Sequence, residues 1–139
     1  CSNAQKIVDY LTKNKNVDKV IYPNIHKAEI GDRAKKYLKG GNGGLVGIEV
    51  KGGVEAGKKF IEALKMFYHV ANIGDARSLA IHPATTTHSQ LSEEELLKAG
   101  VTPGYVRLSI GIEHPDDIID DLDQALSASQ IKPSLKAVS

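Results

Sequence analysis

The sequence contains no tryptophan, a single cysteine and no long apolar run. Because a disulfide needs two cysteines, the lone Cys1 excludes an internal disulfide, and it also excludes a zinc site built from several thiolates. No apolar stretch approaches the ~20 residues that cross a membrane, and the polar N-terminal residues do not resemble a signal peptide. This composition is typical of the reducing cytoplasm, where we expect the protein to reside without a membrane partner.

Charge of one sign is not in excess either. The chain has 18 basic and 17 acidic residues, which gives a formal net charge of +1. The lysines of the N-terminal third are mixed with acidic residues, so they are typical of a solvated surface rather than of a nucleic-acid-binding patch. We therefore expect no nucleic-acid partner.

The 139 residues, of which 41% are hydrophobic, are enough for one compact domain. Aromatic residues make up only 5% of the chain, so its core must be mostly aliphatic. The chain begins inside a helical pattern rather than with an initiator methionine, and we expect it to be a piece of a longer protein. An expression remnant over residues 1–4 is the alternative explanation.

Hydrophobic periodicity predicts an alternation of helices and strands. We expect helices over residues 3–14, 26–41, 54–67, 92–100 and 114–129, and strands over residues 17–22, 45–50, 68–72, 78–83 and 105–113. Strands separated by helices of this length form a small sheet with helices laid on it, an α/β fold of the α+β sandwich kind. The order of the strands in the sheet cannot be derived from this pattern.

Two features that resemble functional motifs favour structural roles. The glycine-rich residues 40–44 precede a predicted strand, whereas a dinucleotide-binding loop follows a strand and opens a helix, so we interpret them as a turn. The predicted C-terminal helix carries several aspartates, which are most simply a solvated helix surface: Asp116, Asp117, Asp120, Asp121 and Asp123.

The two histidines of the segment HPATTTH lie six residues apart, at positions 82 and 88. A metal site would need a third ligand from elsewhere, and no spacing in the chain brings one to them. We therefore interpret His82 and His88 as structural residues and expect no metal.

Arg107 is the most informative polar residue, because it lies in the otherwise apolar strand YVRLSIG. Its guanidinium is a fixed fork of donors that matches a carboxylate in two hydrogen bonds. An arginine at a strand edge that reaches to water is the equally acceptable alternative. Asn72, before the Ile-Gly-Asp turn, can present both a donor and an acceptor, as any turn asparagine can.

The segments GDARSLAIHPATTTHSQLS (residues 74–92) and GYVRLSIGIE (residues 104–113) resemble the Cys/Met-metabolism family of pyridoxal-phosphate (PLP) enzymes. The resemblance extends over residues 3–128 and is strongest to the O-acetylhomoserine sulfhydrylase branch. It implies the small C-terminal domain of a fold-type I transferase over residues 1–128, with a mostly antiparallel sheet and helices packed on one face. Residues 129–139 would then be a frayed tail, and the large cofactor domain would be absent.

The resemblance also implies roles for particular residues. The arginine of the VRLSIG motif, here Arg107, binds the α-carboxylate of the substrate in that family. Asn72, which stands where several relatives have serine, lines the same carboxylate pocket. The segment that contains Thr86, Thr87 and His88 passes near the mouth of the active site.

The whole enzyme would use PLP to replace the acetate of O-acetylhomoserine by sulfide or a thiol, and it would be a homo-oligomer, a tetramer. No Ser-x-x-Lys motif comes after a predicted strand here, so we expect this chain alone to bind no PLP and to be inactive without its N-terminal cofactor domain. A fragment of a cystathionine γ-synthase or γ-lyase is an alternative within the family. A stand-alone small α/β module that binds an amino acid or regulates another protein is the alternative outside it.

Overall fold

The computed structural model describes residues 1–25 and 29–130 of the chain. The helices are α1 (Ser2–Leu11), α2 (Glu29–Tyr37), α3 (Gly53–Ala63), α4 (Glu93–Lys98) and α5 (Pro115–Ser129). The strands are β1 (Val17–Ile21), β2 (Leu45–Val50), β3 (Tyr68–His69), β4 (Leu79–Ile81) and β5 (Tyr105–Ser109), and short 3-10 helices, η1 (Pro23–Ile25) and η2 (Pro83–Thr85), come after β1 and β4. The predicted order of helices and strands is confirmed; the expected start of the second helix at residues 26–28 and the tail at 131–139 lie outside the described residues.

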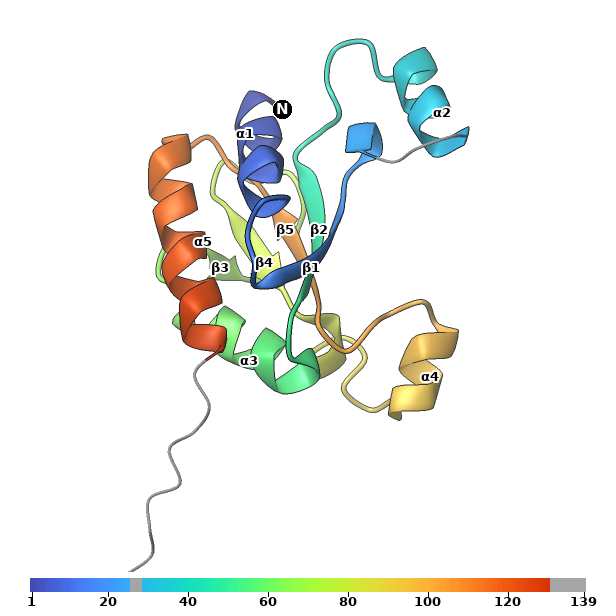
Figure 1. Cartoon of the computed structure of the whole chain (residues 1–139), viewed down its shortest axis with the longest axis vertical. Helices are drawn as coiled ribbons and strands as arrows, with labels where there is room; N and C mark the ends of the chain where they lie inside the picture. Colours follow the sequence, from blue (N-terminus) through green and yellow to red (C-terminus); the bar gives the residue numbers. More distant parts are fainter. Residues whose placement is uncertain (26–28, 131–139) are drawn as a thin grey trace, which may run out of the picture.

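The strands form one sheet in the order β1-β2-β5-β4-β3 (Figure 1). Neighbouring strands are antiparallel except for β3 and β4, which are parallel. The mostly antiparallel sheet that the family resemblance implies is therefore confirmed. The last strand in the chain, β5, occupies the centre of the sheet.

The core lies between the sheet and the helices α1, α3 and α5. The fully buried side chains that meet there come from alternate strand positions and from the three helices: Val46, Ile48, Val106, Leu108, Ile7, Leu11, Phe60, Ile118, Leu122 and Leu126. Burying one aliphatic side chain of this size contributes about 1.5–3 kcal/mol, so this layer is the main source of stability.

Because successive side chains of a strand point to opposite faces, the intervening positions belong to the other side of the sheet. We call this side the open face; it is formed by Leu45, Gly47, Glu49, Leu79, Ile81, Tyr105, Arg107 and Ser109. The helices α1, α3 and α5 do not cover it, so the open face is where polar and functional side chains can stand.

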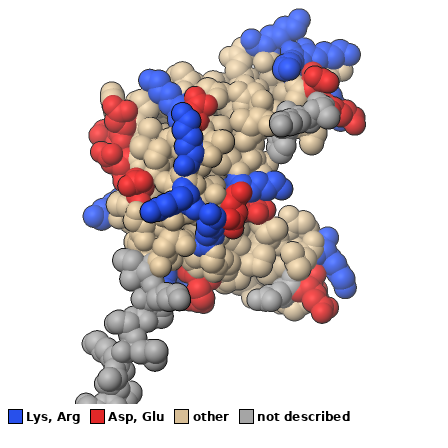
Figure 2. Space-filling model, viewed as in Figure 1, with Lys and Arg blue, Asp and Glu red and all other residues tan. Residues whose placement is uncertain are grey.

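Helices α2 and α4 do not belong to the layer of α1, α3 and α5. They lie on the side of the molecule away from α5, one at each end of that side (Figure 1). Helix α2 packs against η1 and exposes 56% of Ile30 and 68% of Tyr37. Helix α4 begins with a capping box, in which the Ser92 backbone N–H donates to the Glu95 carboxylate at 2.8 Å. The flank between α2 and α4 is hollowed in the space-filling view, where acidic and basic side chains are interspersed (Figure 2).

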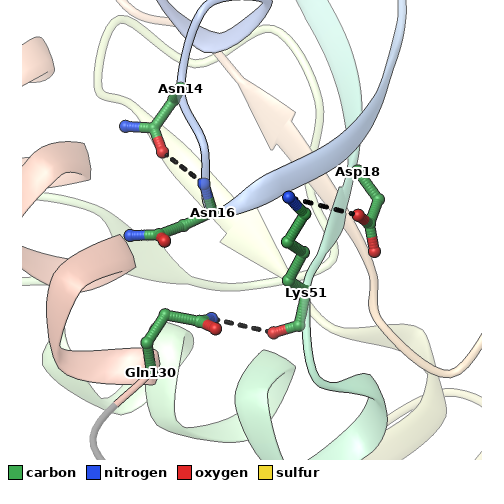
Figure 3. A network of polar contacts seen from close by, with 5 residues as sticks. All are labelled: Asn14, Asn16, Asp18, Lys51 and Gln130. Carbon is green, nitrogen blue, oxygen red and sulfur yellow. Dashed lines mark hydrogen bonds and ion pairs between the residues drawn. The ribbon is translucent and has the colours of Figure 1, made fainter.

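A polar network fastens the end of α5 to the sheet (Figure 3). The Gln130 side-chain amide donates to the Lys51 carbonyl at 2.8 Å, and the Lys51 ammonium lies 3.8 Å from the Asp18 carboxylate. The Lys51 backbone N–H donates to the Asn16 carbonyl at 3.0 Å, while the Asn16 N–H donates to the Asn14 side chain at 2.9 Å. These contacts hold the C-terminal end of α5, which extends to Ser129, next to the end of β2.

Asp121 differs from the expectation of a solvated acidic helix face, which is wrong for this residue. Its side chain is buried between α5 and the end of α3, where its carboxylate accepts the backbone N–H groups of Lys65 at 2.9 Å and Met66 at 2.8 Å. The Gln124 amide donates to the same carboxylate at 3.0 Å. These N–H groups bind Asp121 instead of continuing the helical ladder, so α3 ends at Ala63, before the predicted residue 67.

We expect Asp121→Asn to lower the free energy of unfolding by about 1–3 kcal/mol, because an amide nitrogen would face a buried N–H that needs an acceptor. Urea unfolding followed by circular dichroism measures this change. The matched control is Asp120→Asn, an exposed neighbour on the same helix, which should change stability by less than about 0.5 kcal/mol. Equal losses in the two variants would contradict the role assigned to Asp121.

No helix within residues 1–25 and 29–130 combines the length and the apolar character that a membrane crossing requires.

Candidate functional site

Arg107 lies in the middle of the central strand, paired with Gly47 of β2 and Ile81 of β4. Its side chain is on the open face and half-buried, as expected from its alternation with the core residues Val106 and Leu108. The alternative of an arginine at a strand edge is wrong, because β5 has a neighbour on both sides. Arg107 thus lies on the central strand of the sheet, on the face that α1, α3 and α5 do not cover.

Tyr105 stands beside Arg107 on the open face and is accommodated by a glycine. A Cβ at position 47 would lie only 2.9 Å from Cε2 of the Tyr105 ring, so Gly47 provides the space that the ring occupies. Burial raises the pKa of the Tyr105 hydroxyl, and the nearby positive charge of Arg107 opposes this rise. Tyr105 is therefore a neutral hydrogen-bond donor at physiological pH.

The guanidinium of Arg107 is held by the backbone rather than by an acidic side chain. Its Nη2 donates to the carbonyl oxygen of Ala71 at 3.1 Å. In the part of the chain that the structure describes, no carboxylate lies within ion-pair distance of Arg107. Since a guanidinium has five N–H donors, this geometry orients the group and leaves donors for an external anion.

The structure brings Asn72 to the same place. Asn72 directly follows Ala71, the acceptor of Arg107, in the loop between β3 and β4. It is exposed, and its side chain forms no hydrogen bond with another described residue. Asn72 thus lies one residue along the chain from the acceptor of the Arg107 guanidinium.

Two of the three residues predicted near the mouth of the site border a pocket of about 360 Å³ that also reaches Ala71. Thr86 and Thr87 line it together with mostly apolar side chains: Ile61, His69, Val70, Ala80, Ile81 and His82. The Thr86 hydroxyl donates to the His82 carbonyl at 2.8 Å, and the Thr87 hydroxyl lies 2.8 Å from Nδ1 of His88. His88 itself does not line this pocket.

A second pocket, of about 350 Å³, adjoins Arg107 on the open face. It lies between β1, β2, β5 and α2 and is predominantly apolar, with Ile21, Tyr22, Pro23, Ile30, Leu45, Val46, Gly47 and Tyr105 as its other lining residues. An arginine at the border of an apolar surface binds an anion more strongly than one surrounded by water, because the local dielectric constant is lower.

The structural interpretation of His82 is confirmed. The ring is buried, with Nε2 2.8 Å from the Pro103 carbonyl and Nδ1 3.0 Å from the Thr85 hydroxyl. Because a carbonyl only accepts, Nε2 carries the proton and Nδ1 is the acceptor. Within the described ranges, no three histidine, cysteine, aspartate or glutamate side chains gather where they could hold a metal ion.

The interpretation of the glycines before β2 as a turn is also confirmed. Gly41 and Gly43 adopt φ angles of +131° and +83°, and the Gly43 carbonyl accepts the Tyr22 hydroxyl at 2.8 Å.

Glu113 and Ser78 form a contact at the end of the β3–β4 loop that sequence reasoning missed. The Glu113 carboxylate accepts the Ser78 backbone N–H at 2.6 Å and the Ser78 hydroxyl at 2.9 Å. These bonds fasten the start of β4 to the segment that comes after β5. Gly111 is the sequence feature that reflects this close contact, because a Cβ at this position would collide with the Ala76 carbonyl and the Glu113 carboxylate.

Comparisons with known proteins found similarity over most of the chain. A family model described as "Cys/Met metabolism PLP-dependent enzyme" matches residues 1–127. The O-acetyl-L-homoserine sulfhydrylase of Leptospira meyeri is 53% identical over 125 residues, which are 89% of this chain and 28% of that protein. The L-methionine γ-lyase of Fusobacterium nucleatum subsp. nucleatum is 44% identical over 126 residues, which are 91% of this chain and 32% of that protein.

A solved structure is similar as well. The crystal structure of a Campylobacter jejuni protein described as an O-acetylhomoserine (thiol)-lyase superposes with a TM-score of 0.81 and is 42% identical in sequence. The match covers 91% of this chain and 30% of that one, which contains an N'-pyridoxyl-lysine-5'-monophosphate residue. The chain spans less than a third of the length of these three proteins.

The buried His82 makes the stability of the domain depend on pH. Burial lowers the pKa of His82 in the folded state, although the hydrogen bond to the Pro103 carbonyl opposes this effect. A histidine in the unfolded chain has a pKa of about 6.5, so the unfolded chain binds more protons than the folded chain as the pH falls. The contribution of neutral His82 to the free energy of unfolding is fully present above about pH 6.5. It decreases as the pH falls below this value, by at most about 1.4 kcal/mol per pH unit.

Urea unfolding between pH 7.5 and 5 measures this loss, and His82→Gln should make the pH dependence shallower. His69→Gln, which changes an exposed histidine, is the control and should keep the wild-type slope. An unchanged slope in His82→Gln would show that His82 is not the group responsible.

Proposed function

We propose that this chain, which belongs to the Cys/Met metabolism family of PLP-dependent enzymes, is the small domain of an O-acetylhomoserine sulfhydrylase. The whole enzyme would replace the acetate of O-acetylhomoserine by sulfide or a thiol, giving homocysteine or methionine. This chain would provide the side of the active site that binds the substrate carboxylate.

The observation that carries the proposal is the position of Arg107. Arg107 is half-buried as a residue and lies on the central strand, and its guanidinium is oriented by the Ala71 carbonyl and has no acidic partner among the described residues. Removing a charged group from water without a counterion costs free energy, so such an arginine fits a site whose counterion is the ligand. An α-amino acid supplies the matching carboxylate.

The residues of this chain fit a substrate held by the cofactor rather than the cofactor itself. When bound, PLP supplies an electron sink that stabilises a carbanion next to the substrate nitrogen. Arg107 would hold the carboxylate in two hydrogen bonds, which fixes the rotation of the substrate about its Cα and aligns the Cα–H bond for proton removal. Asn72 would donate to the same carboxylate from the adjoining loop.

Thr86, Thr87 and His88 would shape the entrance next to this carboxylate site. The pocket that reaches from Ala71 to Thr86 and Thr87 supports this role, because it connects their loop with the acceptor of Arg107.

The lysine that binds PLP would come from a separate, larger cofactor domain, as would the groups that bind its phosphate. In support, the chain spans less than a third of its relatives, and the similar Campylobacter structure contains a pyridoxyl-lysine. This chain alone should therefore be inactive, with the cofactor domain as its partner and a homo-oligomer, a tetramer, as the assembled enzyme.

A γ-lyase is the second candidate, and the 44% identity to an L-methionine γ-lyase favours it. The two reactions share the carboxylate site and diverge only after the leaving group has departed. A sulfhydrylase adds sulfide or a thiol, whereas a γ-lyase releases an α-keto acid and ammonia. Product analysis with and without added sulfide distinguishes them.

The test is a reconstitution assay. The chain is mixed with the separately expressed cofactor domain, PLP, O-acetylhomoserine and sulfide, and homocysteine formation is measured. We expect activity only when both pieces are present, and we expect Arg107→Ala to lower kcat/KM by about 100-fold or more, because it removes two charge-assisted hydrogen bonds.

Arg77→Ala is the matched control, since Arg77 is an exposed arginine of the β3–β4 loop that lies over the Tyr68 ring at 4.8 Å. It should retain most of the activity. Activity from this chain alone, or equal activity in wild type and Arg107→Ala, would contradict the proposal.

A further inference from the structure

We infer that Glu113 is a positioning residue for the substrate-carboxylate site, an inference that rests on the proposed function. Glu113 does not contact Arg107. Instead, its carboxylate fixes Ser78 and thereby the loop of residues 70–77, whose Ala71 carbonyl orients the guanidinium.

The bonds between Glu113 and Ser78 anchor one end of this loop. Glu113 accepts the Ser78 N–H at 2.6 Å and the Ser78 hydroxyl at 2.9 Å. The same hydroxyl accepts the Gly111 N–H at 2.9 Å, and the Ser78 carbonyl accepts the Tyr68 N–H at 3.0 Å. Ser78 is fully buried. Its hydrogen bonds join the starts of β3 and β4 to the segment after β5.

Further contacts carry this anchoring along the loop towards Arg107. The Ile112 N–H donates to the Ala76 carbonyl at 2.9 Å, and the Gly74 N–H donates to the Ser109 hydroxyl at 3.3 Å. The last contact in the series is the Arg107 bond to Ala71. All residues from 71 to 77 are exposed, so the loop depends on these polar contacts rather than on burial.

The chemistry of the anchor requires a carboxylate. Both groups that face Glu113 are donors, because the Ser78 hydroxyl already accepts from Gly111 and directs its own hydrogen towards Glu113. A carboxylate accepts both bonds, whereas a glutamine would turn an NH2 group towards one of the two donors. Glu113 has no cationic partner among the described residues, so an ion pair does not account for it.

Loss of the anchor should weaken the interactions that depend on the substrate carboxylate. When the loop shifts, Arg107 loses its oriented acceptor and Asn72 moves away, while PLP and its lysine remain in place on the other domain. Because Arg107 both binds the carboxylate and orients the substrate, a change of this kind lowers kcat/KM, while a ligand without a carboxylate binds as before.

The experiment uses the full-length enzyme that carries this chain, with Glu113→Gln, Arg107→Ala and the control Asp121→Asn. Asp121 is another carboxylate that accepts backbone N–H groups, but it lies on the helical side of the sheet, away from the open face. The measurements are kcat and KM for O-acetylhomoserine and the inhibition constants of L-norvaline and butylamine. These two inhibitors differ only by the carboxylate.

We expect Glu113→Gln to lower kcat/KM and to raise the norvaline inhibition constant, each about 10-fold, with the butylamine constant within about 3-fold of wild type. Asp121→Asn should leave the ratio of the two inhibition constants unchanged. Ser78→Ala, a small and apolar replacement at a buried position, removes one of the two bonds to Glu113 and should change the norvaline constant in the same direction.

Two results would overturn the inference. If Glu113→Gln and Ser78→Ala change the inhibitor ratio no more than Asp121→Asn does, Glu113 has only a structural role. If Arg107→Ala itself leaves norvaline binding unchanged, the proposed carboxylate site is wrong, and the role of Glu113 is wrong with it.

Discussion

The constraint on which the structure depends is the unequal covering of the two faces of one sheet. Helices α1, α3 and α5 bury the aliphatic residues of one face, so the charged residue of the central strand must stand on the other. Since side chains alternate along β5, burial of Val106 and Leu108 fixes the direction of Arg107 without any contact from Arg107 itself. The hydrophobic core therefore orients the candidate site.

The loop between β3 and β4 completes the site that the sheet begins. It is exposed and could not hold its shape by burial, yet it provides the acceptor of Arg107 and carries Asn72. Its shape comes from hydrogen bonds to β5 and to the segment after it. A site of this kind joins a rigid strand to a loop that polar contacts hold in place, which is how a scaffold usually presents binding groups.

Two carboxylates accept hydrogen bonds from buried or partly buried donors in different parts of the domain. Asp121 accepts the N–H groups that come after α3, and Glu113 accepts the N–H and hydroxyl of Ser78. In each case donors at one end of a helix or strand need an acceptor. Both partners are distant in sequence, so neither role is visible in local patterns, and the assignment of Asp121 to a solvated face is wrong for this reason.

The sequence by itself determined the order of helices and strands, because hydrophobic periodicity and capping residues act over a few positions. It also identified Arg107, since a charge between apolar strand residues is conspicuous and the surrounding motif resembles a known family. Only the tertiary structure decided that β5 is central, that Arg107 faces Ala71 and that Glu113 anchors Ser78. These contacts join residues about 35 positions apart, and such pairings depend on how whole strands pack rather than on any local preference of the chain.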